Sequence, residues 1–274
     1  MNLMQYPREY SIDHFSRPNS WELEGKSYEL VLDDGADVTL SFSGRKVSFS
    51  GAQYDYLCVK ADESTYLVSF ELSVTEDHTY VLDLAQRLVT RLVCRKGLNP
   101  KNSHLMDRQF TFGAIRMRGY KLPYKRHSFT TETLGTTVQW RWSPDMYTKH
   151  AYLESDWYRI TWDDDGAAAE DFDSTNEMVP STDERARYIK IKDGLYLFSL
   201  TEETLERLLG ENQHFRCNNM VLLQNYDRMY QVGRIFGDMI KKGSPFHLHK
   251  TLCASGSPVE LPEEFLSAEN PYTV

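Results

Sequence analysis

Apolar and polar residues alternate along most of this chain, in short runs that turn residues interrupt. Two clear examples are SYELVLDDGADVTLSFSGRKVSFSG at 27–51 and TTVQWRWSPDMYTKHAYLESDWYRITWDDDG at 136–166. Side chains of a β-strand point alternately to its two faces, so this period of two predicts half-buried antiparallel strands.

The residues between the runs fit tight turns. Asp34-Gly35 and Asp193-Gly194 are typical hairpin dipeptides, and Ser143-Pro144-Asp145 predicts a type I turn. One segment differs: in TEETLERLLGENQ, at 201–213, leucines recur at helical spacing before Gly210. We expect one short helix there.

The two halves of the chain repeat the same order of segments. YLVSF at 66–70 aligns with YLFSL at 196–200, an offset of 130 residues, and apolar strands flank both. Gly25-Lys26 opens one series and Gly135-Thr136 opens the other. Agreement in order over most of each half predicts two copies of one β-unit.

Each copy holds about six to eight short strands in meander order, which favours an up-and-down barrel. We therefore predict an all-β fold of two tandem calycin-like or lipocalin-like antiparallel barrels, with a short helix and an extended linker. Two stacked β-sandwiches are the alternative. The expected division is a first barrel over 1–97, a basic connector over 98–132, a second barrel over 133–240 and a C-terminal tail over 241–274.

Two segments lie outside the repeat and have strongly biased charge. The connector 98–132 has seven Lys or Arg against two acids, which suits either a linker packed across an acidic neighbour or a gate for an anionic ligand. The insertion 163–184, within the second copy, has nine acids and no base. At this length it is either a mobile lid or a disordered segment.

Composition narrows the class of function. The net charge is −9, which argues against nucleic acid or an anionic membrane as a partner. No basic region followed by an apolar run opens the sequence, and no run of about 18 apolar residues occurs, so we expect a cytoplasmic protein. The four cysteines, Cys58, Cys94, Cys217 and Cys253, form no CxxC pair and are expected to be buried thiols.

Common catalytic motifs are missing from the sequence. It has no phosphate-binding glycine loop, no GxSxG and no HExxH, which argues against the common nucleotide-binding, hydrolase and zinc-protease classes. His247 and His249 would lie on one side of a strand, a spacing that some metal sites use, but without a third ligand they fit an exposed tail better. We expect neither a metal nor a cofactor.

Three segments of the second repeat, HAYLESDWYRITW, DGLYLFSLTEE and VLLQNYDRMYQVGRIFG, resemble the molybdenum cofactor biosynthesis F (MoaF) family. The resemblance runs from Trp140 to Gly237 and extends to the first repeat only through its pattern. It implies two tandem calycin-type barrels and lends no catalytic residues. The chain departs from the family at Glu154, where asparagine is expected, and in its enlarged acidic insertion.

A second, local likeness concerns chemistry. GLYLFSLTE, followed by VLLQN and Met229, is similar to the matching strands of bacterial phenolic acid decarboxylases, which are single barrels without a cofactor. The glutamate that ends this strand is catalytic in that family, which implies a catalytic role for Glu202. The tyrosine pair of the family falls on Trp140 and Trp142 here, and its arginine has no match at the same spacing.

Strand alternation puts Tyr196, Phe198, Leu200 and Glu202 on one face. If this face points into the barrel, burial raises the pKa of Glu202 and suits it to act as a general acid or base. The alternative is an exposed strand end or the first turn of the following helix. The matching position of the first copy is Leu72, so we expect any chemistry to take place in the second barrel.

Other candidates follow from the same alternation. Arg187 is in phase with Ile189 and Ile191, so it either points into the barrel to hold a carboxylate or lies near the rim by the acidic insertion. His150 and Tyr152 share a face that is either a cavity wall or the solvent side. The predicted ligand-binding residues are Trp140, Trp142, Tyr152, Phe198, Asn225 and Arg185.

These candidates combine into one leading hypothesis. A small aromatic or apolar organic molecule binds in the second barrel and undergoes cofactor-free acid–base chemistry, such as decarboxylation, isomerisation or cyclisation. Glu202 transfers the proton, Arg187 or Arg185 holds the anion, and Tyr196 and His150 supply supporting hydrogen bonds. The alternatives are a non-catalytic carrier or accessory protein of a biosynthetic pathway, and a structural partner with a solid interior; a homodimer is compatible with each.

Overall fold

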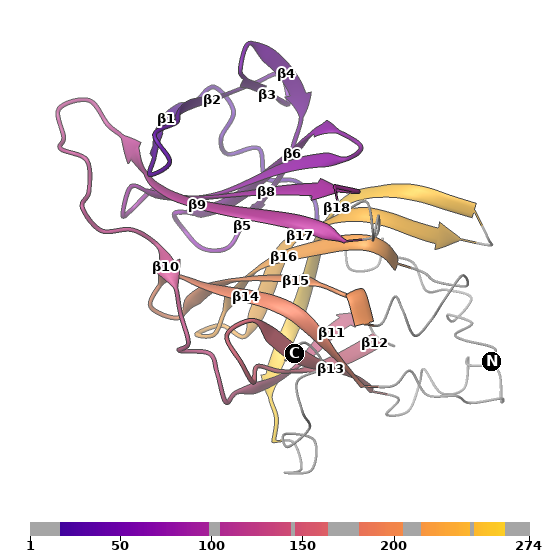
Figure 1. Ribbon diagram of the computed structural model, residues 1–274. Helices are drawn as coiled ribbons and strands as arrows, with labels where there is room; N and C mark the ends of the chain where they lie inside the picture. Colours follow the sequence, from indigo (N-terminus) through magenta and orange to yellow (C-terminus); the bar gives the residue numbers. More distant parts are fainter. Residues whose placement is uncertain are drawn as a thin grey trace.

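The computed structural model describes residues 17–98, 105–143, 146–163, 181–204, 215–241 and 244–260. Most of the described residues lie in antiparallel β-strands, which form two curved sheets stacked on each other (Figure 1). The predicted all-β fold with two tandem barrels is confirmed.

The first sheet curls into a half-barrel. Its nine strands are β1 (Ser27–Leu32), β2 (Asp37–Ser43), β3 (Lys46–Phe49), β4 (Ala52–Asp55), β5 (Leu57–Lys60), β6 (Thr65–Ser73), β7 (Glu76–Asp83), β8 (Leu88–Lys96) and β9 (Met106–Arg116). Their spatial order is β4-β3-β2-β1-β9-β8-β7-β6-β5. Within the described residues β4 and β5, the two edges, form no ladder with each other, so hydrogen bonding does not close this sheet.

The second sheet closes into a complete barrel. Its strands are β10 (Ser128–Phe129), β11 (Thr137–Ser143), β12 (Met146–Ala151), β13 (Trp157–Asp163), β14 (Thr182–Lys192), β15 (Leu195–Thr201), β16 (Phe215–Asn225), β17 (Tyr230–Lys241) and β18 (Ser244–Pro258). From β11 to β18 each strand pairs with the next, and β18 pairs back with β11, which gives an eight-stranded up-and-down barrel. β10 is an extra short strand beside β14.

The turns that open the two sheets show the repeat in atomic detail. The amide of Gly25 donates to the carbonyl of Phe42 at 2.8 Å, and the amide of Gly135 donates to that of Tyr152 at the same distance. Both glycines have positive φ, 75° and 79°, a left-handed conformation that glycine adopts without steric cost. The predicted match of Gly25 with Gly135 is therefore confirmed, because both halves contain the same turn.

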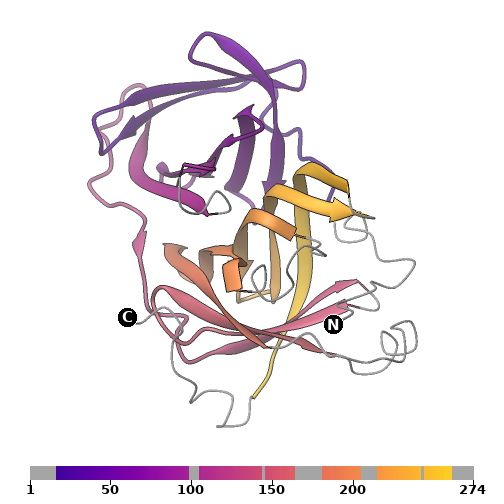
Figure 2. The same ribbon diagram turned by 45° about the vertical axis from the view of Figure 1, so that its right-hand side comes forward.

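The repeated sequence motif YLxS lies in equivalent strands, β6 and β15, and alternate side chains of these strands pack on two different surfaces. Phe70 and Phe198 belong to the interior clusters of their own half. Leu67 and Leu197 lie on the opposite face, in a third cluster that both halves share. The two barrels therefore pack through the outer faces of these strands, and Figure 2 shows the curled sheet above the closed barrel.

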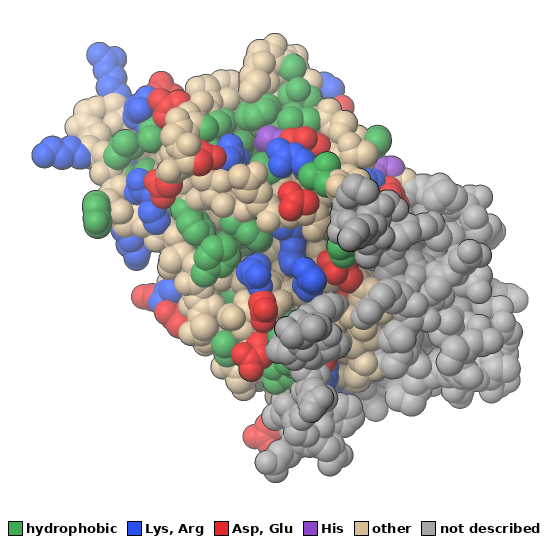
Figure 3. Space-filling view, viewed as in Figure 1, with side chains coloured by type: hydrophobic (Ala, Val, Ile, Leu, Met, Phe, Trp, Pro, Cys, Tyr) green, Lys and Arg blue, Asp and Glu red, His purple; other side chains and the backbone are tan. Residues whose placement is uncertain are grey.

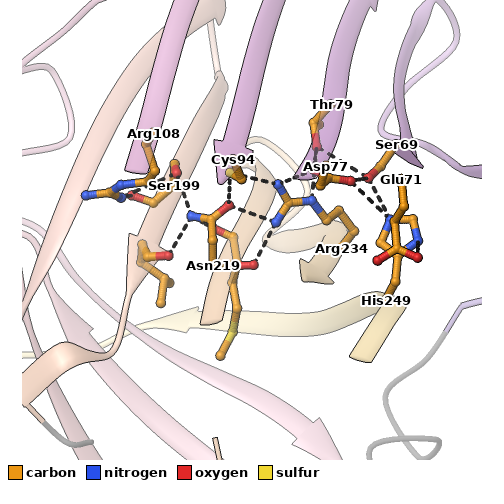
Figure 4. Close-up of polar contacts among 12 residues, drawn as sticks. Ser69, Glu71, Asp77, Thr79, Cys94, Arg108, Ser199, Asn219, Arg234 and His249 are labelled. Atoms are coloured by element: carbon orange, nitrogen blue, oxygen red, sulfur yellow. Dashed lines mark hydrogen bonds and ion pairs between the residues drawn. The ribbon is translucent and has the colours of Figure 1, made fainter. Parts of the chain in front are cut away.

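A buried ion pair lies at the centre of the contact between the barrels (Figure 4). Arg234 of β17 donates from Nη2 to Oδ2 of Asp77 in β7 at 2.8 Å, and neither side chain is exposed. The guanidinium also donates to Thr79 Oγ1 at 3.0 Å and to the carbonyl of Asn219 at 2.6 Å. Arg234 thus holds groups from both halves at once.

The polar groups around this pair follow an approximate two-fold pattern. Ser69 donates to Asp77 of its own half and contacts Nε2 of His249 from the other half at 2.8 Å. The repeat partner of Ser69, Ser199, accepts from Asn219 of its own half at 3.1 Å, and its carbonyl accepts from Arg108 of the other half at 3.0 Å. The strand registers make Asp77 equivalent to Asn219 and Arg108 equivalent to His249.

The structure divides the chain differently from the prediction. β9 lies within the segment predicted to be a basic connector, and β18 lies within the predicted tail. Both are central members of their sheets. The connector was expected to be a linker or a gate and the tail to be exposed, but the polar outer faces of both strands are covered by the other barrel, where Arg108 and His249 find their partners.

Two predicted segments fall largely outside the described residues. Of the acidic insertion predicted at 163–184, residues 164–180 are not described, and Thr182–Glu184 belong to β14. Of the helix predicted at 201–213, residues 205–213 are not described. The predicted hairpin turns at Asp34-Gly35 and Asp193-Gly194 are present, with φ of 88° and 71° at the glycines.

One strand pairing depends on the absence of a side chain. A Cβ atom at Gly233 in β17 would overlap the carbonyl of Val221 in the neighbouring strand, and this backbone cannot move aside as a side chain would. We expect Gly233→Ala to lower the free energy of unfolding by at least about 2 kcal/mol, because added volume in a packed site forces the backbone apart. Urea unfolding measures this. Gly119→Ala, where the methyl meets open space, is the control and should cost only its left-handed strain, about 1 kcal/mol; equal losses would contradict the steric explanation.

Candidate functional site

The middle of the second barrel is filled by aromatic rings. Phe198 is at the centre and contacts Tyr152, Tyr158 and Tyr188, with ring centroids 5.0–5.5 Å away. Trp140 and Trp142 belong to the same buried cluster. Trp140, Trp142, Tyr152 and Phe198 therefore lie in the barrel interior, where the sequence placed the ligand-binding residues.

Glu202 lies at one end of this interior, directly after β15. It follows the inward-pointing Phe198 and Leu200 in phase and is 4% exposed. Its Oε2 is buried and has no hydrogen-bond partner in the described part of the chain. Burial, and to a smaller degree the negative charge of Glu184, raises the pKa of Glu202 to about 8. Near neutral pH this carboxyl is therefore largely protonated.

Two further polar groups lie at the same end. The phenol of Tyr158 is fully buried and has no hydrogen-bond partner among the described residues. Burial is the main cause that raises the pKa of Tyr158, and the negative charge of the nearby Glu202 adds to it. The imidazole of His150 packs on Tyr158 with centroids 5.0 Å apart. Tyr158 thus contacts the histidine ring and is also near the carboxyl of Glu202.

His150 is held neutral. Its Nε2 contacts Thr148 Oγ1 at 3.0 Å, and that hydroxyl also accepts from the indole of Trp142 at 2.8 Å. Its Nδ1 is buried without a partner among the described residues. Burial lowers the pKa of His150 to about 3, so the ring offers either a donor or an acceptor at Nδ1 without a charge.

The opposite end of the barrel is closed by its own hydrogen bonds. Trp140 Nε1 and Gln224 Nε2 both donate to the hydroxyl of Tyr152, at 3.0 and 2.6 Å. Gln224 also donates to Gln231 Oε1 at 3.0 Å. All four side chains are buried. This network fixes Tyr152, although Gln224 Oε1 and Gln231 Nε2 remain without partners among the described residues. Buried unpaired atoms therefore occur at both ends, and within the described residues the Glu202 end is the one where they include a carboxyl oxygen.

The two arginines predicted to hold an anion are on the outside. Arg187 is in phase with Ile189 and Ile191, as predicted, but both isoleucines pack against the first half rather than into the barrel. Arg187 Nη1 donates to the backbone of Ala186. Arg185, half exposed, pairs with Glu203 at 3.4 Å. The inward orientation considered for Arg187 is therefore not found, and neither arginine shares the interior with Glu202.

Tyr196 and Asn225 also lie away from Glu202. Tyr196 is the second residue of β15, the strand that Glu202 follows, so the two are about 20 Å apart along it. Its hydroxyl donates to Glu132 at 2.9 Å. Asn225 Oδ1 accepts the amide of Arg228 at 3.0 Å and so stabilises the turn between β16 and β17. Of the predicted catalytic residues, His150 is the one that the structure brings to the Glu202 end.

Sequence reasoning missed two members of this end, Tyr158 and Glu184. Glu184 is buried and its Oε2 accepts the amide of Thr204 at 2.8 Å. It had been assigned to the acidic insertion, although it is in phase with Ala186 and Tyr188, which line the interior. That phase was the available signal. For Tyr158 the signal was its alternation with Ile160 in the same strand.

The structure also bears on metal binding, on membrane-spanning helices and on the cysteines. Across the described ranges, no three His, Cys, Asp or Glu side chains are grouped so that they could hold a metal ion. His247 and His249 lie in β18 against the first half, where His247 contacts Glu71. In the same ranges, no helix has the length and apolar character needed to cross a bilayer. Of the four cysteines expected to be buried thiols, Cys58 and Cys94 are buried free thiols, Cys253 is a free thiol that is only partly buried, and the side chain of Cys217 lies outside the described part of the structure.

Comparison with known proteins yields only distant structural likeness. No protein-family model and no curated protein matches the sequence. Among solved structures, one described as "a putative beta-lactamase from Burkholderia vietnamiensis" aligns with 47% of this chain and 96% of its own, at 12% identity and a TM-score of 0.30. A likeness at this level does not identify a family, and the resemblance to the MoaF family stays a prediction.

Proposed function

We propose that this protein binds a small organic molecule at the Glu202 end of the second barrel and that Glu202 transfers a proton to or from it. The observation that supports this most directly is a buried carboxyl group whose Oε2 has no hydrogen-bond partner among the described residues. Such a group costs folding free energy, commonly about 1–3 kcal/mol. Buried carboxyls with strongly raised pKa values occur preferentially at functional sites.

The chemistry would be general acid–base catalysis without a cofactor. A carboxyl with a pKa near 8 is protonated at neutral pH and can donate its proton, and it can recover one without a large change in free energy. Tyr158 and His150 supply two more hydrogen-bonding atoms at the same end, Oη and Nδ1. The surrounding rings, Trp142 and Phe198 among them, suit an aromatic or apolar ligand.

A carrier without catalysis is the second candidate, and one observation favours it. The arginines predicted to hold a substrate anion lie outside the barrel, so the described interior offers no cation to orient a carboxylate for decarboxylation. A neutral, hydrogen-bonding ligand then fits better than an anionic one. Such a ligand would bind to Glu202 in its protonated form and leave unchanged.

Glu202→Gln separates the two candidates. The protein is screened by chromatography against small phenols and aromatic acids, p-coumaric acid among them, for product formation, and by ligand-observed NMR for binding. If Glu202 transfers the proton, turnover should fall by about 10²–10⁴-fold in the variant, because the amide cannot exchange a proton. Glu203→Gln, next to it but paired with Arg185 outside the barrel, should keep full turnover. Full turnover by Glu202→Gln would exclude catalysis by Glu202, and binding without any product would support the carrier.

A further inference from the structure

The concave face of the first sheet carries a polar group of its own. The ladders of β7, β8 and β9 place Tyr80 opposite Arg91, and Arg91 opposite Thr111. These side chains share the inward phase of Leu82 and Val89, which belong to the interior cluster of this half. The first copy lacks a counterpart of Glu202, but it places the cation of Arg91 on its inward face. The described residues of the second barrel place no cation on theirs.

Arg91 retains hydrogen-bonding capacity. Its Nη2 donates to Asp34 Oδ2 at 2.5 Å and to Thr111 Oγ1 at 3.1 Å, and the side chain is 12% exposed. Its Nε is buried and has no hydrogen-bond partner in the structure as described. Because a guanidinium has five donor hydrogens in one plane, Arg91 can hold another oxygen acceptor beside Asp34.

Two neighbours of Arg91 also have unused atoms. The hydroxyl of Tyr80, which is fully buried, and Nδ1 of His78 have no partner among the described residues. His78 is fixed from its other side, where Nε2 lies 2.8 Å from Glu76 Oε1. Burial raises the pKa of Tyr80, and the adjacent Arg91 guanidinium opposes this shift only in part, so the hydroxyl keeps its proton beside Arg91.

Aromatic rings line the same face. Phe70 stacks on Tyr80 at 5.9 Å and on Tyr54 at 5.6 Å, and Phe49 contacts the ring of His78 at 5.2 Å. Phe49 and Tyr54 are only half-buried, so this aromatic surface continues to the solvent. Figure 3 shows hydrophobic side chains at the surface of this half, beside charged ones. The open edges of the sheet, β4 and β5, leave this side free of a closing ladder.

We propose that the concave face of the first sheet is a second ligand site, for a small planar carboxylate such as an aromatic acid. The carboxylate binds to Arg91 and Tyr80, and the ring packs against Phe49, Phe70 and His78. Unpaired donors beside an aromatic wall are the features with which proteins bind such molecules. The site is independent of the function proposed for Glu202, because it uses different residues in the other half of the chain.

Asp34 has a specific part in this proposal. It lies on the turn between β1 and β2, 37% exposed, and already places a carboxylate on Arg91. A ligand carboxylate would compete with it for the guanidinium, or bind beside it against its negative charge. Removing the charge of Asp34 should therefore strengthen ligand binding, whereas a purely structural ion pair predicts no such gain.

Titration with benzoate tests the site. Binding is monitored by calorimetry and by the NMR chemical shifts of Tyr80 and His78. Benzoate should bind the wild-type protein at least about fivefold more tightly than the uncharged benzamide, a comparison that needs no variant. Asp34→Asn should tighten benzoate binding by about fivefold or more. Arg91→Lys should weaken it, and Arg91→Met should abolish it. Arg116→Gln, at an exposed arginine of β9, should leave it unchanged.

Several outcomes would overturn the proposal. Equal affinity for benzamide and benzoate would exclude recognition of the carboxylate. Benzoate shifts confined to the second barrel, or lost in Glu202→Gln, would place the ligand elsewhere. If Asp34→Asn weakened binding, or if folded Arg91→Lys bound benzoate as the wild type does, the pair would be structural only. Circular dichroism of each variant establishes that it is folded.

Discussion

Replacing Asp77 by alanine should lower the free energy of unfolding by about 3–5 kcal/mol, because the substitution leaves Arg234 charged and fully buried. Arg234 would keep its hydrogen bonds to Thr79 and Asn219, but these are neutral acceptors. Burial alone would raise the pKa of Asp77, but the charge of Arg234 and the hydrogen bond from His249 outweigh it and hold the pKa below its usual range. The carboxylate is thus ionised at pH 7, and its removal leaves a net buried charge.

Urea unfolding at pH 7 measures this loss, with Asp55→Ala as the matched control. Asp55 also pairs with a cation, Lys46, but that pair is exposed, so its loss should cost less than about 1 kcal/mol. The double replacement Asp77→Leu with Arg234→Met should recover most of the stability, since apolar side chains can replace a buried ion pair. A loss near 1 kcal/mol for Asp77→Ala would show that water reaches Arg234.

Raising the pH from 5 to 9 should destabilise the wild-type protein through Glu202. The pKa of this carboxyl is about 8 in the folded chain and 4.5 when unperturbed. Between these values the folded state binds more protons than the unfolded state, so stability decreases as pH rises. The contribution is fully present below about pH 4.5 and is lost by the time pH passes 8, with an expected size on the order of 3–5 kcal/mol.

Glu202→Gln isolates this contribution. The glutamine side chain does not titrate, so the free energy of unfolding of the variant should change less over the same pH range. Relative to the wild type, the variant should therefore become more stable as the pH rises from 5 to 8. Other groups, such as His247, whose hydrogen bonds to Asp238 and Glu71 raise its pKa to about 9, titrate in both proteins and cancel in the difference. Parallel curves would show that the Glu202 pKa is not raised.

Much of the fold could be predicted from the sequence because local rules determine it. Alternation with period two gave the strands, and Asp-Gly dipeptides gave hairpin turns that have the expected backbone. The offset of 130 residues between YLVSF and YLFSL predicted equivalent strands, and these are β6 and β15. The phase from Phe198 also leads to Glu202, and the structure buries it, which is the first of the two positions that the sequence left open.

The rest depends on which surface covers which, and local alternation does not contain that information. β14 has apolar residues on both faces, because one face lines the barrel and the other packs on the first half. Arg187 is in phase with the second set, so its orientation could not be deduced from phase alone. The same applies to β9 and β18, whose polar outer residues find their partners more than 90 residues away in sequence.

The approximate two-fold contact between the halves constrains how this protein could have arisen and what it can associate with. Lys96 and Asp238 occupy equivalent positions and pair with each other at 2.6 Å, next to Asp77 and its own equivalent, Asn219. In a symmetric dimer of identical barrels each of these positions would face a copy of itself, lysine against lysine or aspartate against aspartate. Joining two copies in one chain removes that restriction, because each half can then diverge to complement the other. The present contact is therefore specific to unlike halves, and an isolated first half should be unable to replace its partner with a second copy of itself.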